Sequence, residues 1–181
     1  KNVTEGLHTD GYSYMFHQLL TRPGKTIRET VLRTYDNNIT TYMQRINRNR
    51  SIPIRLKYFQ YLAVLVAEIY LDKYFKDPIK LVNEINEYYR REVDPYKLYD
   101  EKNLNKIAYW MATGSGKTII MHINILQFQR YNQGPHRIKY DNILLITAND
   151  DMTEQHLDEI AESSIEAVRF DGTQTAYNFR N

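Results

Sequence analysis

A glycine-rich segment between two apolar runs holds the residues of this chain that are best suited to chemistry. Residues 107–123 have the sequence IAYWMATGSGKTIIMHI. Gly114 and Gly116 would let the backbone wrap closely around phosphate oxygens, because a Cβ there would crowd the ligand or forbid a positive φ. Lys117 offers a flexible positive charge to the terminal phosphates, and the Thr118 hydroxyl is suited to Mg²⁺. This composition predicts a polyphosphate site.

The spacing of these residues matches G-x-x-x-x-G-K-[ST], except that Met111 stands at the first glycine position. Taken alone, the short stretch GSGKT could be a turn and a helix cap. Its surroundings favour the phosphate interpretation, because an apolar run precedes it and residues at helical spacing follow it.

The elements around the glycines have the order expected of an α/β fold. Residues 142–147, NILLIT, form a continuous apolar run typical of a strand that is covered on both faces. Asp151 and Glu154 resemble a capping box that opens a helix. Alternating strands and helices predict a parallel sheet, a RecA-like P-loop NTPase lobe that is incomplete here. The expected elements are a strand at 106–111, a helix at 116–131, a strand at 142–147, a helix at 151–162 and a strand at 165–170.

The first half of the chain is predicted to form a helical layer. Apolar residues recur there every three or four positions, with Asn37 and Asn38 as a point where one helix could split into two. Pro53 is placed to begin a helix, and Asp77 is placed to cap the next one. The expected helices cover 14–20, 26–48, 53–77 and 78–91. A charged linker follows, so we expect a helical region at 1–103 and a motor region at 104–181.

Composition limits the classes of protein that this chain can belong to. It has 181 residues, 42% of them hydrophobic, a formal net charge of +2 and no cysteine. These values favour a folded protein without disulfides, and they give no overall electrostatic signal for nucleic acid. No run of about 18 apolar residues or secretory leader is present, so we expect a cytoplasmic protein without a membrane partner.

Two other groups of residues are given ordinary structural roles. The five histidines show no metal-ligand spacing, and surface or helix-face positions suffice for them. A basic run between Arg45 and Lys57 could meet a phosphate backbone, but such runs usually form a solvated face.

Three segments resemble superfamily 2 helicases and translocases, the DEAD/DEAH-box group. MATGSGKT, residues 111–118, resembles motif I, most closely that of the helicase subunits of type I and type III restriction enzymes. Residues 143–160 resemble motif Ia and the helix after it. RLKYFQ, residues 55–60, resembles an upstream element whose glutamine contacts adenine. The resemblance implies ATP and Mg²⁺ as cofactors and nucleic acid, most simply double-stranded DNA, as a partner.

The resemblance also assigns roles to individual residues. It implies nucleotide contacts by Gln60 and by the loop, Mg²⁺ coordination by Thr118, and a catalytic role for Lys117. Nucleic-acid contacts are implied for Thr147, Ala148 and Asn149. The loop residues concerned are Thr113, Gly114, Ser115, Gly116, Lys117 and Thr118.

The implied function is the ATP-binding part of a nucleic-acid-dependent ATPase, with a nuclease or methyltransferase as a possible partner. No D-E-x-[HD] string follows Thr118. Hydrolysis in this class needs that carboxylate pair and an arginine finger, so we expect an N-terminal portion of a longer motor that is inactive alone. Two alternatives stay open: a P-loop kinase or ATPase of another class, and a non-catalytic helical interaction module with a degenerate nucleotide fold.

Overall fold

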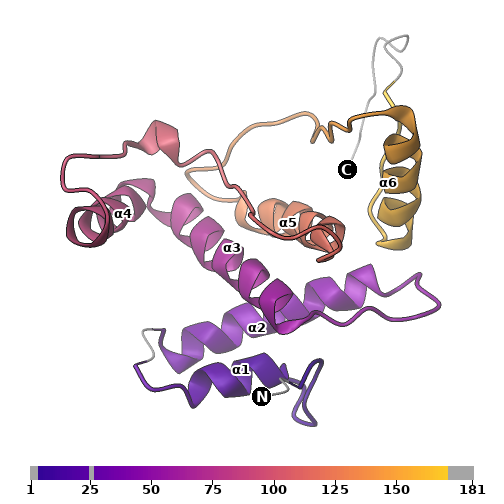
Figure 1. Ribbon diagram of the computed structural model, residues 1–181, viewed down its shortest axis with the longest axis horizontal. Coiled ribbons are helices and arrows are strands. Elements are labelled where there is room, and N and C mark those ends of the chain that lie inside the picture. The colour runs from indigo at the N-terminus through magenta and orange to yellow at the C-terminus, as the bar shows by residue number, and fades with distance from the viewer. Residues whose placement is uncertain (1–3, 25–26, 171–181) are drawn as a thin grey trace.

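The computed structural model describes residues 4–24 and 27–170, and helices dominate it (Figure 1). Its elements in chain order are α1 (Tyr14–Leu20), α2 (Glu29–Ile46), α3 (Tyr58–Lys76), α4 (Pro78–Glu92), a 3₁₀ turn η1 (Glu101–Asn103), α5 (Lys117–Tyr131) and α6 (Asp150–Glu162). The boundary that we predict at residue 103 stays a prediction, and residues 171–181 of the second region lie outside the described residues.

Local sequence signals explain where most helices begin. The Asp77 carboxylate accepts a hydrogen bond of 2.9 Å from the Lys80 N–H, and Pro78 occupies the first position of α4. Asn149, rather than Asp151, caps α6 by accepting a bond of 2.9 Å from the Met152 N–H. The start expected at Pro53 was wrong, because α3 begins five residues later, at Tyr58.

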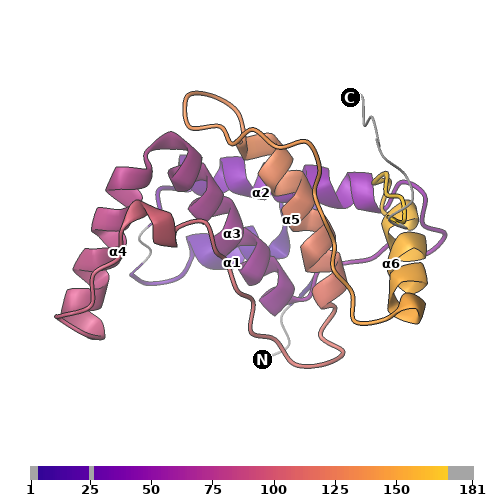
Figure 2. The ribbon, with the colours of Figure 1, turned by 90° about the horizontal axis from the view of Figure 1, so that it is seen from above.

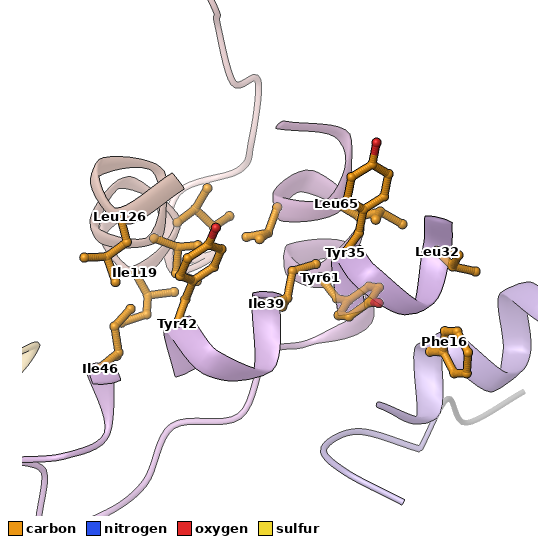
Figure 3. Close-up of a cluster of buried hydrophobic side chains, with 13 residues drawn as sticks. Phe16, Leu32, Tyr35, Ile39, Tyr42, Ile46, Tyr61, Leu65, Ile119 and Leu126 are labelled. Atoms are coloured by element: carbon orange, nitrogen blue, oxygen red, sulfur yellow. The ribbon is translucent and has the colours of Figure 1, made fainter. Parts of the chain in front are cut away.

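The main hydrophobic core lies where α1, α2, α3 and α5 meet (Figure 3). The expected split of α2 does not occur. Asn38 is buried and lies in the middle of a continuous helix. A smaller cluster joins α4 to η1 through Leu81, Val82 and Leu104. The buried members of the main core are Phe16, Leu32, Tyr35, Ile39, Tyr42, Ile46, Tyr61, Val64, Leu65, Ile119, Ile120, Ile123 and Leu126.

Helices α3 and α5 run side by side in the same direction (Figure 2). A buried carboxylate, that of Glu68, joins them. It accepts hydrogen bonds from Gln127 Nε2 (2.6 Å) and Tyr131 Oη (2.7 Å) of α5. Asn38 Nδ2 (2.7 Å) and Tyr42 Oη (3.3 Å) of α2 donate to the same carboxylate. Burial raises the pKa of Glu68, and these four donors oppose that rise by stabilising the charged form.

Helix α6 is attached to the bundle by polar contacts at its C-terminal end. His122 of α5 is fully buried, and its Nδ1 shares a hydrogen bond of 2.8 Å with Ser163 Oγ. Arg50 donates to the same hydroxyl (2.9 Å) and pairs with the Glu162 carboxylate (2.6 Å). Burial lowers the pKa of His122 to about 4, so its imidazole is neutral at neutral pH. Of the two positions expected for this histidine, the surface position was therefore wrong, because His122 lies on a buried face of α5.

The parallel sheet that we predict is absent from the described residues, so the α/β, RecA-like assignment is wrong. An isolated bridge between Leu7 and Ser13 is the one β-type pairing among them. The three expected strands, at 106–111, 142–147 and 165–170, have no regular secondary structure and no strand partners. Leu144 is 78% exposed and Ile146 is 90% exposed. An apolar run specifies an extended shape locally but does not specify its partner, and here helices supply the core instead.

Within the described ranges, the longest and most apolar helices fall short of what crossing a membrane requires.

Removing the Glu68 carboxylate should weaken the whole bundle. Glu68→Ala removes the acceptor that four donors share in or beside the core, so we expect a loss of about 3 kcal/mol or more in the free energy of unfolding. That corresponds to a fall in Tm of roughly 6–12 °C. Glu84, which pairs with Lys73 on the surface, is the control, and Glu84→Ala should cost less than about 1 kcal/mol. Equal losses for both variants in urea unfolding would contradict the assigned role of Glu68.

Candidate nucleotide-binding site

The glycine-rich loop leaves an extended segment and enters α5 directly. Gly114 has φ 74° and Gly116 has φ 76°, the left-handed region that L-residues rarely adopt. The Ser115 N–H donates to the Ala112 carbonyl over 3.3 Å, which closes a turn over residues 112–115. Gly116 is the N-cap residue of α5. The loop therefore leads to a helix N-terminus, where backbone N–H groups lack partners within the helix.

Lys117 is the first residue of α5, and its side chain folds back over the loop. Its Nζ donates to the Ala112 carbonyl over 3.0 Å and to the Met111 carbonyl over 3.3 Å. The ammonium group is exposed. The two carbonyl oxygens hold it beside the loop. A positive charge thus stands next to the glycines that the sequence singled out.

Gln60 of α3 lies against the same loop from the other side. Its Oε1 accepts from the Lys57 N–H at 2.8 Å, and its Nε2 donates to the Ser115 carbonyl at 2.8 Å. Gln60 is buried, and a Cβ built on Gly116 would lie only 2.3 Å from its Nε2. The sequence separation of Gln60 and Ser115 is 55 residues. The structure therefore brings Gln60 to the loop, and the adenine contact expected from RLKYFQ stays a prediction.

The two threonines of the loop have different surroundings. Thr113 is exposed, whereas Thr118 is half-buried in the first turn of α5. Thr118 and Lys117 line a pocket of about 810 Å³ between α5 and the segment that leads into α6. Met152 and His156 of α6 line its opposite side. The pocket is mainly apolar away from the loop, so its polar end is where α5 begins.

The predicted nucleic-acid residues form the turn before α6. Thr147 Oγ1 hydrogen-bonds Thr153 Oγ1 over 2.5 Å, and Asn149 caps the helix. Ala148 lies between them and is exposed. The side chains of Thr147 and Asn149 therefore shape the turn, which leaves Ala148 and the backbone as its outward surface. These residues do not line the pocket beside Lys117.

The basic run has mainly structural contacts. The Arg45 guanidinium reaches the Ser164 carbonyl at 3.3 Å, and Arg50 reaches the end of α6. Positive charge near the carbonyls of a helix C-terminus is stabilising. Lys57 pairs with Glu5 at 3.1 Å. The solvated-face interpretation is incomplete, because the side chain of Arg50 is only 11% exposed.

Sequence spacing missed a cluster near the N-terminus. His8, Asp10 and His17 each place one ligand atom within 4.8 Å of the others. The signal available in the sequence was His-x-Asp followed, seven residues after the aspartate, by a second histidine. The turn that brings these residues together could not be derived from that spacing.

A comparison with known families supports the relationship that the motifs indicate. A family model described as "Type III restriction enzyme, res subunit" matches residues 68–180, more than half of the chain. The match contains the glycine-rich loop, α5 and α6 and begins after Gln60. Neither the curated proteins nor the solved structures contain a match.

The two glycines of the loop should respond differently to a methyl group. In Gly116→Ala the new methyl group would clash with Gln60, and the alanine would also have to adopt a left-handed φ. In Gly114→Ala the φ is also left-handed, but the new Cβ has open space around it. We expect Gly114→Ala to cost about 1–2 kcal/mol from backbone strain, and Gly116→Ala to cost about 1 kcal/mol more. Urea unfolding measures both.

Gln60→Ala provides the matched test of this difference. In that background the clash is gone, so Gly116→Ala should cost no more than Gly114→Ala. If the two alanine variants are equally destabilised while Gln60 is present, the close contact is not a constraint on the loop.

Proposed function

We propose, because the chain belongs to the type III restriction enzyme res subunit family of helicase-like ATPases, that its glycine-rich loop binds ATP with Mg²⁺. The observation that carries this proposal is the arrangement at the start of α5. Two left-handed glycines, an exposed ammonium group and a helix N-terminus lie within residues 114–117. Each of these features favours a polyanion over a neutral ligand.

Two features of the loop support a triphosphate as its ligand. A Cβ at Gly114 would meet nothing within 4 Å, so there is open space beside that residue. The backbone N–H groups of the first turn of α5 have no acceptor four residues earlier in a helix, so phosphate oxygens would supply acceptors. The residues proposed to hold the phosphates are Thr113, Gly114, Ser115, Gly116, Lys117 and Thr118.

Lys117 and Thr118 have distinct proposed roles. The Lys117 ammonium exchanges its two carbonyl partners for phosphate oxygens, which bear full negative charge and make stronger hydrogen bonds. The Thr118 hydroxyl, at the polar end of the pocket, is the proposed ligand to the metal. At that position a bound Mg²⁺ would supply positive charge that offsets the charge of the phosphates.

Gln60 is proposed to act on the nucleotide through the loop. Both atoms of its amide are already engaged, one with Lys57 and the other with Ser115. A direct contact with adenine would require the bond to the Ser115 carbonyl to break. Holding that carbonyl fixes the orientation of the peptide between the two glycines, which orders the phosphate cradle before the nucleotide arrives.

We also propose that the turn at 147–149 contacts nucleic acid. Family membership supports an interaction with nucleic acid. The acidic first turn of α6 would repel phosphates, but Arg169 pairs with Asp150 and with Glu154 at 2.8 Å each and offsets part of that charge. Exposed Ala148 leaves the backbone of the turn accessible. The identity of double-stranded DNA, and of a nuclease or methyltransferase partner, stays a prediction.

ATP binding is tested by thermal shift with millimolar ATP and Mg²⁺. A ligand that binds only the folded state raises Tm by mass action, so the wild-type chain should be stabilised. Lys117→Ala should lose the rise, because the phosphates lose their cation. Lys102→Ala, which removes an exposed ammonium from η1, should keep it. A wild-type Tm that does not change with ATP and Mg²⁺ would rule out nucleotide binding by this chain.

The nucleic-acid contact is tested by placing a negative charge on the turn. Ala148→Glu should weaken binding to a labelled DNA duplex by several-fold at low salt, because it adds repulsion beside the backbone phosphates. Ala161→Glu adds the same side chain at an exposed position near the other end of α6 and should leave affinity unchanged. Fluorescence anisotropy gives both affinities. Equal affinities for the two variants would place the nucleic acid elsewhere.

A further inference from the structure

A short turn before α1 brings two imidazoles and a carboxylate together. His8 Nδ1 lies 3.2 Å from Asp10 Oδ1, and His17 Nε2 lies 3.0 Å from Asp10 Oδ2. The rings of His8 and His17 have their centroids 4.8 Å apart. Asp10 thus stands between two nitrogen donors, and the three residues face one point from two elements of the chain.

The backbone of the turn is closed by hydrogen bonds. The His8 N–H donates to the Tyr12 carbonyl over 2.7 Å, and the Gly11 N–H donates to the His8 carbonyl over 3.0 Å. Gly11 has φ 87°, which a residue with a Cβ would adopt only with strain. The Tyr12 N–H donates to Asp10 Oδ1 over 3.1 Å. These bonds fix His8 and Asp10 on one side of the turn.

The turn is also tied to the core of the bundle. Ser13 caps α1 and donates hydrogen bonds from both its N–H and its hydroxyl to Asp36, a fully buried residue of α2. The Tyr61 hydroxyl of α3 donates to the same carboxylate. Phe16, one residue before His17, is fully buried and anchors α1. The positions of His8, Asp10 and His17 are therefore set by the packed interior, although their polar atoms face solvent.

We propose that His8, Asp10 and His17 bind a divalent first-row transition-metal ion of the Zn²⁺ class. Zn–N bonds of about 2.0–2.1 Å in a tetrahedral site place neighbouring ligand atoms about 3.4 Å apart. The two contacts to Asp10 are already within a few tenths of an ångström of that separation. The two histidine rings, which are only partly covered, need a small rotation to bring their nitrogens to the same spacing. Water completes the coordination on the exposed side.

The donor set decides which metals the site accepts. Two imidazole nitrogens and one carboxylate oxygen suit Zn²⁺, Co²⁺ or Ni²⁺, whereas Mg²⁺ and Ca²⁺ prefer oxygen ligands alone. The cluster lies outside residues 68–180, and it is separate from the magnesium site proposed at Thr118.

The test is a titration of the complete, tag-free chain with Co²⁺, followed by its visible absorption, and then with Zn²⁺ as competitor. We expect one equivalent to bind and excess Mg²⁺ not to compete. His8→Ala, Asp10→Asn and His17→Ala should each lower the affinity by about tenfold or more. His136→Ala, which removes an exposed imidazole from a different loop, should leave the affinity unchanged.

A second measurement uses only wild-type protein, so it does not depend on whether the variants fold. In wild-type protein, two-dimensional NMR of the imidazole nitrogens should show Zn²⁺ shifting His8 Nδ1 and His17 Nε2. Signals of His136 should stay in place. If the ligand variants bind Co²⁺ as tightly as His136→Ala does, or if Zn²⁺ leaves the His8 and His17 signals unchanged, the cluster is only a hydrogen-bonded ion pair and the proposal is wrong.

Discussion

The buried carboxylate of Glu68 is the constraint on which the arrangement of the helices depends. A buried charge is tolerated only when its lone pairs are satisfied, and here the donors come from two other helices. Sliding α5 along α3 by one turn, about 5.4 Å, would take Gln127 and Tyr131 out of reach. The register of α5 against α3 is thereby fixed. Because Gln60 and Ser115 lie at the starts of these two helices, that register also decides how the glycine-rich loop meets α3.

The helices could be predicted because their signals are local. Asp77 and Pro78 mark a helix start through groups only a few residues apart, and α4 begins there. The prediction of a sheet was wrong, because strand pairing joins distant segments and the apolar content of a run does not specify a partner. Residues 142–147 have the composition of a buried strand, yet Leu144 and Ile146 are exposed. The prediction of a buried strand was therefore wrong for this segment.

The same difference between local and long-range signals applies to the candidate site. The loop is encoded by adjacent residues, so Gly114 and Lys117 could be singled out from composition alone. The contact between Gln60 and Ser115 spans 55 residues, and neither local spacing nor the resemblance of RLKYFQ, which implied a contact with adenine, predicted it. The burial of His122 could not be predicted for a different reason. Helix α5 buries residues on more than one face, and the cover over His122 comes from the end of α6, which no periodicity in α5 can reveal.

Gln60 connects the loop to residues that precede the matched part of the chain. Its Oε1 satisfies the Lys57 N–H, while its Nε2 holds the Ser115 carbonyl, so the start of α3 and the loop share one side chain. Lys57 in turn pairs with Glu5, close to the turn that carries His8. An exposed pair of this kind contributes little energy, but the amide of Gln60 is buried, and its loss would leave two backbone groups without partners. The segment before residue 68 therefore supports the loop physically, although the family match begins after it.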